Sequence, residues 1–240
     1  MNKENPAILV VDDDHDIVNA IAAVLEKEGY RIYKAYNGLE AVDMLMQCDV
    51  QLILIDVMMP KMDGLSAMMK IRTMKNIPII VLSAKSEDSD KILGLSMGAD
   101  DYITKPYNPM ELAARVNSNL RRYLSLGAAD SAGQSNTIRI GGLLLNKDEK
   151  QLYVDGSPVR LTATEYRIVE LLMENAGRTF SAEEIYSRVW NEDSYSVENT
   201  VMVHIRHIRE KIEIDPGEPR YLKVVWGIGY KIERGRDDKK

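Results

Sequence analysis

Over its first half, the chain alternates short apolar runs with amphipathic helical patterns, and this alternation restricts the possible folds more than any other feature. The five apolar runs span residues 7–11, 31–35, 52–56, 78–83 and 101–104. The five helical patterns span residues 16–28, 38–46, 64–74, 89–97 and 108–124. Continuous apolar runs of this length are typical of parallel strands that are buried on both faces. We therefore predict a doubly wound α/β domain, whose parallel strands follow the order 2-1-3-4-5.

The second half has a different pattern. Strand-like alternation at residues 138–145 and 151–154 precedes three helical segments, which end near residues 175, 190 and 214. Capping motifs at Thr162 and Ser181 mark the starts of the first two helices. A hairpin that turns through residues 226–228 follows the third helix. Helix, loop, helix and hairpin in this order predict an α+β winged helix-turn-helix domain. The expected parts are a domain at residues 1–124, a flexible small-residue linker at 125–136, a second domain at 137–233 and a charged tail at 234–240.

The composition is that of a globular protein, with 45% hydrophobic and 28% charged residues. No segment approaches the roughly 20 apolar residues of a membrane span, and the polar start does not resemble a signal peptide. The single cysteine, Cys48, excludes an intrachain disulfide and fits a reducing compartment, so we expect a cytoplasmic protein with no membrane partner. The net charge of −6 gives no support for nucleic-acid binding, because residues 137–240 carry 17 Lys+Arg against 18 Asp+Glu.

Three carboxylates follow two strands that should be neighbours in the sheet. Asp12 and Asp13 end the first strand, and Asp56 ends the third. In the predicted strand order these strands are adjacent, and the crevice for ligands lies at their carboxyl ends. Converging carboxylates repel one another, and a hard cation such as Mg²⁺ relieves the repulsion. The plainer interpretations are a solvated acidic loop for residues 12–14 and a helix-capping role for Asp56.

Two further polar residues end strands at the same edge of the sheet. Ser83 ends the fourth strand, and Lys105 follows the fifth. A lysine there can neutralise an anion, and a hydroxyl group can donate a hydrogen bond to a phosphoryl oxygen. The alternative for Lys105 and Pro106 is a rigid turn without a chemical role.

These residues resemble those of the receiver domains of two-component response regulators. The matching elements, over about residues 7–124, are Asp12-Asp13, Asp56 with Met59-Pro60 and Gly64, Ser83-Ala84, and Lys105-Pro106. The resemblance implies that Asp56 accepts a phosphoryl group from the phosphohistidine of a sensor histidine kinase. It also implies that Mg²⁺ is held by Asp13, Asp56 and the Met58 carbonyl, with Asp12 acting through a water, while Lys105 neutralises the phosphoryl charge.

The same resemblance makes Ser83 and Tyr102 a switch, in which Ser83 moves toward the phosphoryl group and Tyr102 rotates inward. The alternative for Tyr102 is an ordinary half-buried strand aromatic. Met58 and Lys85 should flank the phosphoryl group, and neither is suited to orienting an attacking water. We therefore expect slow self-dephosphorylation and no other enzymatic activity.

The second domain resembles the OmpR/PhoB class of transcription factors. The segments that carry the match are residues 161–166, 200–206 and 227–230, within about residues 137–233. The resemblance implies that Val203 and His207 approach base edges, and that residues 191–197 face RNA polymerase. The implied phosphate contacts are Trp190, Asn199, Thr200, His204, Arg206 and Arg209. Many relatives carry at the wing tip an arginine that reaches into the minor groove. Trp226 stands there instead, so that arginine contact is missing, and Trp226 is itself an expected DNA-binding residue.

By itself, the basic cluster on this last helix would suit a solvated face. His207 replaces an arginine of some members, so we expect thymine-methyl contacts from Val203 to share in base discrimination. Two strings, at residues 204–211 and 226–233, resemble the vancomycin-resistance regulators of the VanR type.

Opposite charges occur in register on the fourth helix, the last strand and the last helix of the first domain. In the resembled class these positions pair two receivers in a symmetric dimer that forms on phosphorylation. The residues concerned are Lys91, Leu95, Asp100, Asp101, Glu111, Ala114, Arg115 and Arg122. The alternative is that these charges only solubilise the helix faces. The class implies direct-repeat half-sites on promoter DNA and mostly activation of transcription.

Two other functions compete with a phosphorylation-dependent transcription factor. An aspartate-nucleophile phosphatase would need a second carboxylate two residues after Asp56, where Met58 stands, and a cap domain, which the sequence lacks. A DNA-binding protein that works without phosphorylation, and that keeps the receiver as a dimerisation scaffold, is the second alternative.

Overall fold

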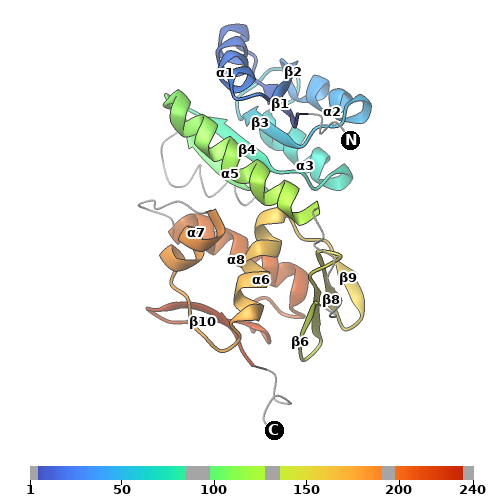
Figure 1. Cartoon of the computed structure of the whole chain (residues 1–240), viewed down its shortest axis with the longest axis vertical. Helices are drawn as coiled ribbons and strands as arrows, with labels where there is room; N and C mark the ends of the chain where they lie inside the picture. The colour runs from blue at the N-terminus through green and yellow to red at the C-terminus, as the bar shows by residue number, and fades with distance from the viewer. Residues whose placement is uncertain (1–4, 85–97, 128–135, 191–197, 235–240) are drawn as a thin grey trace. The chain divides into compact units, whose positions relative to one another are not determined.

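The computed structural model describes residues 5–84, 98–127, 136–190 and 198–234 (Figure 1). The chain divides into two compact units, Met1–Tyr123 and Leu124–Lys240, and each is described by itself. Across the described ranges, no helix is both long enough and apolar enough to span a membrane.

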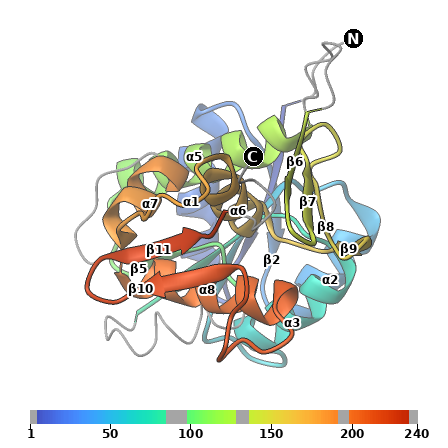
Figure 2. The ribbon, with the colours of Figure 1, turned by 90° about the horizontal axis from the view of Figure 1, so that it is seen from below.

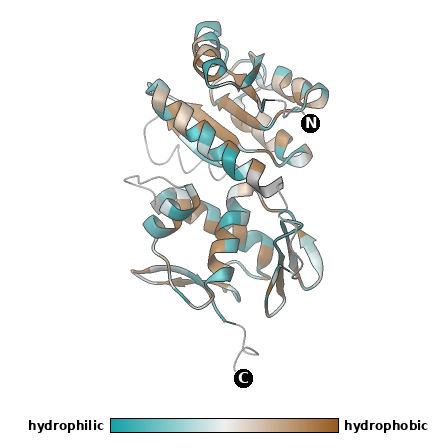
Figure 3. Ribbon diagram, viewed as in Figure 1, coloured by the Kyte–Doolittle hydropathy of each residue, from teal (hydrophilic) through white to brown (hydrophobic). Residues whose placement is uncertain are grey.

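The first unit contains a five-stranded parallel sheet in the order β2-β1-β3-β4-β5, which confirms the predicted fold. Its strands are β1 (Ala7–Val11), β2 (Arg31–Ala35), β3 (Leu52–Asp56), β4 (Ile79–Ser83) and β5 (Asp101–Thr104). Every residue of β1, β3 and β4 is buried, as expected for strands covered on both faces. Figure 3 shows these strands as a largely hydrophobic layer.

The helices of this unit agree with the predicted patterns, with shifts at their ends. They are α1 (His15–Lys27), α2 (Gly38–Gln47), α3 (Gly64–Met74) and α5 (Pro109–Gly127), while the helix predicted at 89–97 lies outside the described residues. Asp14 caps α1 by accepting hydrogen bonds from the Asp16 and Ile17 amides. Helix α5 continues to Gly127, into the predicted linker, because no helix-breaking residue occurs before that glycine.

The second unit begins with a four-stranded antiparallel sheet, β6 (Thr137–Ile140), β7 (Leu143–Asn146), β8 (Gln151–Val154) and β9 (Ser157–Val159). The prediction of one strand over residues 138–145 was wrong, because the chain turns at Gly141, where φ is +57°. The sequence analysis also missed β9. It follows a tight turn in which Asp155 and Gly156 both have positive φ.

Three helices and a hairpin complete this unit: α6 (Ala163–Glu174), α7 (Ala182–Trp190), α8 (Glu198–Ile212), β10 (Leu222–Val225) and β11 (Gly229–Ile232). The predicted capping box is confirmed, since Thr162 and Glu165 bond reciprocally at the start of α6. Helix α8 turns its predicted apolar face, Val201, Ile205, Ile208 and Ile212, into the core. Figure 2 shows β10 and β11 side by side as a two-stranded ribbon.

Candidate functional site

A partly buried lysine joins two carboxylates at the ends of neighbouring strands in the sheet of the first unit. Lys105 Nζ lies 2.6 Å from Asp12 Oδ2 and 2.5 Å from Asp56 Oδ1. β1 and β3 pair in parallel, and both carboxylates are almost fully buried, Asp12 at 1% and Asp56 at 6% exposure. The sequence prediction that these strand ends converge on one site is therefore met for Asp12, Asp56 and Lys105.

The backbone around Asp56 fixes its carboxylate and leaves little room nearby. The Met58 amide donates to Asp56 Oδ2 at 2.7 Å, and the Asp14 amide donates to Asp12 Oδ1 at 3.0 Å. At Gly64, the first residue of α3, an added Cβ would lie 1.9 Å from the Asp56 carbonyl oxygen. The sequence motif includes Gly64, and the structure supplies the reason: only glycine permits this approach of helix to strand.

Burial and charge act in opposite directions at this site. Burial raises the pKa of Asp56, and it outweighs the hydrogen bond and charge of Lys105, which lower this pKa. For Lys105, burial lowers the pKa, but hydrogen bonds to Asp12 and Asp56 outweigh it and hold the pKa above its ordinary value. The sequence analysis missed Tyr107, whose pKa is raised by burial first and also responds to these three charges. Its position after Lys105-Pro106 was the available signal.

The third predicted carboxylate, Asp13, is exposed, and the structure does not gather it with the other two. Within the described ranges, no group of three or more His, Cys, Asp or Glu side chains is placed to hold a metal ion. The donor chemistry nevertheless suits Mg²⁺, since all the predicted ligands are oxygen atoms at one edge of the sheet. Met58 is 68% exposed, and its backbone carbonyl is the group expected to bind the ion.

The two predicted switch residues lie on adjacent strands. Ser83 is buried at the end of β4, and its carbonyl accepts a hydrogen bond of 2.7 Å from the Lys105 amide. Tyr102 is partly buried on β5, in register with Val81 of β4. Ser83 is thus beside the Asp56–Lys105 pair, and Lys85 lies outside the described residues.

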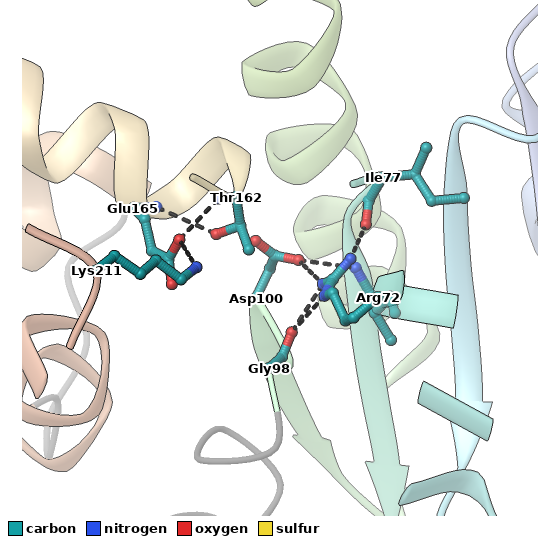
Figure 4. Close-up of polar contacts among 8 residues, drawn as sticks. Arg72, Ile77, Gly98, Asp100, Thr162, Glu165 and Lys211 are labelled. Atoms are coloured by element: carbon teal, nitrogen blue, oxygen red, sulfur yellow. Dashed lines mark hydrogen bonds and ion pairs between the residues drawn. The ribbon is translucent and has the colours of Figure 1, made fainter. Parts of the chain in front are cut away.

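Several of the charged residues expected to pair two receivers have partners within the described part of one chain. Arg115 contacts both Asp101 and Glu111 at 3.1 Å, and Arg122 donates to Ser118 Oγ at 2.9 Å. Asp100 is 1% exposed and accepts from Arg72 at 2.5 Å, and Arg72 also binds the Gly98 and Ile77 carbonyls (Figure 4). The structure thus contradicts a free role for Asp100 between chains, because its carboxylate is buried within the fold. Ala114 is exposed, while Lys91 and Leu95 lie outside the described residues.

In the second unit, the output domain of the predicted regulator, part of the expected DNA-binding set is accessible. Arg206 is exposed on α8, while Asn199, Thr200, His207 and Arg209 are partly exposed. Arg209 Nε donates to the Leu222 carbonyl of β10 at 3.0 Å, so it also attaches α8 to the hairpin. Trp226 is 88% exposed between β10 and β11. The sequence analysis missed Met202, which is 45% exposed on α8.

Three members of that set are buried. Trp190 has no exposed surface and stacks on Tyr186 at 4.7 Å, and His204 is 2% exposed with its ring 5.5 Å from the Trp190 ring. Side-chain contacts of Trp190 and His204 with phosphates were therefore wrong expectations, because both rings are packed inside the domain. Val203 is 3% exposed but does not belong to the core cluster of this domain, and its base contact stays a prediction.

Comparisons with known proteins agree with both domains. The family model of the response regulator receiver domain matches residues 8–117, and that of the C-terminal domain of transcriptional regulatory proteins matches residues 156–232. The regulatory protein VanR of Enterococcus faecium is 40% identical over 228 residues, which cover 95% of this chain and 98% of VanR.

The uncharacterized transcriptional regulatory protein YcbL of Bacillus subtilis is 42% identical over 224 residues, which cover 93% of this chain and 99% of YcbL. Among solved structures, a mutant of RitR aligns with a TM-score of 0.76 at 26% identity, covering 96% of this chain and all of that one. With a receiver, a C-terminal regulatory domain and such relatives over nearly its whole length, the chain belongs to the OmpR/PhoB-type two-component response regulators.

Proposed function

We propose that this response regulator is switched by phosphorylation of Asp56 and then acts on promoter DNA. The contact of Lys105 with both Asp12 and Asp56 is the observation that carries the proposal. An Asp56 oxygen forms a bond to phosphorus while the bond from phosphorus to the histidine nitrogen of the kinase breaks. Lys105 lies within reach of the added negative charge, and phosphoryl transfer depends mainly on such positioning and neutralisation.

Mg²⁺ is the cofactor proposed for this site. Asp13, Asp56 and the Met58 carbonyl would hold it, with Asp12 acting through a water. When bound, Mg²⁺ supplies positive charge beside the phosphoryl oxygens. In the structure Lys105 contacts both Asp12 and Asp56. When Mg²⁺ binds, these two carboxylates would interact with the ion as well as with the lysine.

The proposed response is a change at Ser83 and Tyr102 that favours dimerisation through α5, β5 and the segment before β5. Two output domains would then bind direct-repeat half-sites. Val203 and His207 would approach bases, and Asn199, Thr200, Arg206 and Arg209 would contact phosphates. The regulator would act mostly as an activator, through RNA polymerase at residues 191–197, which lie outside the described ranges. Similarity to VanR suggests glycopeptide or cell-envelope resistance genes as targets.

The comparisons give a response regulator of the transcription-factor kind, not a classical enzyme, so the phosphatase alternative is dropped. A regulator that binds DNA without phosphorylation remains the second candidate. The intramolecular pairing of Asp101 with Arg115 favours it, because these charges are already satisfied in one chain.

Sedimentation velocity with Mg²⁺ separates the two candidates. We expect beryllofluoride or acetyl phosphate to convert the wild-type monomer to a dimer and to leave Asp56→Ala unchanged. Asp43→Asn, a change of an exposed carboxylate on α2, is the matched control and should respond like the wild type. A wild type whose mass does not change with either reagent, yet which binds DNA, would support the phosphorylation-independent alternative.

The phosphorylated state should also be long-lived, because Met58 offers no carboxylate or amide to orient an attacking water. Purified protein labelled with a phosphoryl group should lose its label over many minutes in Mg²⁺ without a kinase. Loss of the label within seconds would contradict this expectation.

A further inference from the structure

The tip of the β10–β11 hairpin, which we call the wing tip, groups several exposed apolar side chains. Trp226 is 88% exposed, Ile228 is 61% exposed and Val224 is 36% exposed. Large apolar side chains grouped at such exposure are typical of a contact surface. The Ile228 amide donates to the Val225 carbonyl at 2.9 Å, so a hydrogen-bonded turn presents both Trp226 and Ile228.

The base of the hairpin is held firmly. Phe180 and Tyr230 exchange two backbone hydrogen bonds of 2.9 Å, and Arg209 of α8 bonds the Leu222 carbonyl. At Gly229, an added Cβ would lie 1.9 Å from the Phe180 carbonyl oxygen, whereas at Gly227 it would meet nothing within 4 Å. The wing tip is therefore carried on an anchored ribbon that is attached to the recognition helix, and its own surroundings are open.

The charges along the hairpin indicate what the wing tip contacts. Lys223 and Lys231 are register partners on β10 and β11, so two lysines occupy facing positions of the ribbon. Like charges directly opposite each other destabilise a strand pair, and a polyanion offsets this repulsion. Lys223 also bonds the Pro219 carbonyl, and Lys231 lies 3.2 Å from Glu233. Cations along the ribbon and an apolar end fit duplex DNA, in which phosphates flank stacked bases.

The family resemblance implies that the wing tip reaches the minor groove, and we propose that in this chain it does so as an apolar wedge, with the Trp226 indole stacked on a base at an opened step. Side chains that partly unstack a base step and bend the duplex are known devices of minor-groove binding proteins. Aromatic stacking on bases is tolerant of sequence, so this contact strengthens binding and shapes the DNA more than it selects a base. The inference rests on the proposed DNA-binding function and specifies how the wing takes part in it.

The two tryptophans of the chain allow a direct test, because Trp190 is fully buried and Trp226 is not. The full-length protein, activated with beryllofluoride and Mg²⁺, is titrated with a short duplex that it has selected from a random-sequence pool. Trp226→Phe leaves only Trp190 emission, and subtraction gives the Trp226 signal. We expect the duplex to dim the Trp226 emission and to shield it from acrylamide, with no change in Trp190.

Substitutions test the wedge independently of fluorescence. Trp226→Ala should weaken binding about tenfold, in the range of one lost base–aromatic stack, and should reduce the DNA bend measured by energy transfer between duplex ends. Trp226→Phe should keep most of the affinity and the bend. Ile214→Ala removes a side chain that is 96% exposed in the loop after α8, and this matched control should change neither quantity.

If the protein binds the duplex while Trp226 stays open to acrylamide, the wedge is overturned and DNA binding stands. If no duplex is bound by the activated protein, both the wedge and the proposed function are overturned.

Discussion

The proposed phosphoacceptor site and the proposed recognition helix, α8, were predicted from the same sequence, but the structure agrees with the first prediction more closely than with the second. At the phosphoacceptor site, Asp12, Asp56 and Lys105 meet as predicted, although they are far apart in the chain. On α8 and its neighbour α7, two expected surface residues, His204 and Trp190, are inside the domain.

The difference lies in what brings the residues together. Parallel strands deliver their last residues to one edge of a sheet, so strand order alone makes the strand ends converge. A helix distributes its residues around an axis, and the burial of each flank depends on the elements packed beside it. Sequence periodicity identifies the core face of α8, but it does not show how deeply the residues beside that face are buried.

The largest expected effect contrasts a buried charge of the receiver with an exposed charge of α8. Asp100→Ala should lower the free energy of unfolding by about 3–5 kcal/mol, because Arg72 loses the carboxylate that its guanidinium faces. Glu210→Ala breaks the exposed pair with Arg206, at 2.9 Å, and should cost less than about 1 kcal/mol. Urea unfolding of both variants measures the difference, and equal losses would contradict it.

The next prediction compares the anchored base of the hairpin with its open tip, using one glycine from each. Gly229→Ala should destabilise the output domain by about 3 kcal/mol, because its Cβ collides with the Phe180 backbone. Gly227→Ala, at φ +71° in open space, should cost only about 1 kcal/mol. Thermal unfolding compares the two glycines, and similar melting temperatures would show that the base of the hairpin yields.

A third pair tests the corrected assignment on α8 itself. His204→Ala should destabilise the domain by about 2 kcal/mol, since it removes a ring packed near Trp190. Arg206→Ala should leave stability within about 0.5 kcal/mol and reduce the salt dependence of DNA binding by about one unit of slope. Binding titrations at several salt concentrations measure this slope. If His204→Ala changed the slope and Arg206→Ala did not, the corrected assignment would be wrong.

The smallest effect concerns the helix that follows Asp56. Asp63 caps α3 by accepting hydrogen bonds from the Ser66 amide and hydroxyl group, and these bonds lower its pKa. Asp63→Ala should cost about 1 kcal/mol at neutral pH.

Because the folded pKa of Asp63 is lowered, its contribution is present above the unfolded pKa and is lost as the pH falls through the folded pKa. The gap in stability between wild type and Asp63→Ala should therefore narrow in acid. Asp63→Asn, a neutral capping residue, should show a smaller change with pH. A gap that widened in acid would rule out this role for the carboxylate.

Particular elements show how much of the structure could be predicted from the sequence. Alternation of apolar runs with helical patterns gave the five parallel strands and their order, and the capping box gave the start of α6. The strand predicted at 138–145 failed because an apolar alternation continues across Gly141 and Gly142, where only the positive φ of Gly141 marks the turn between β6 and β7. The exposure of Met202 and the burial of His204 were likewise not encoded in the period of α8.

The sequence by itself determined the receiver fold, the winged helix-turn-helix and the meeting of Asp12, Asp56 and Lys105, because local periodicity and strand topology depend on residue order. Only the tertiary structure decided that Asp100 is held by Arg72 inside the fold, that Trp190 and His204 are buried, and that Trp226 stands exposed on an anchored hairpin. These outcomes depend on side chains from separate elements competing for the same contacts, and no spacing along the chain specifies which contact is made.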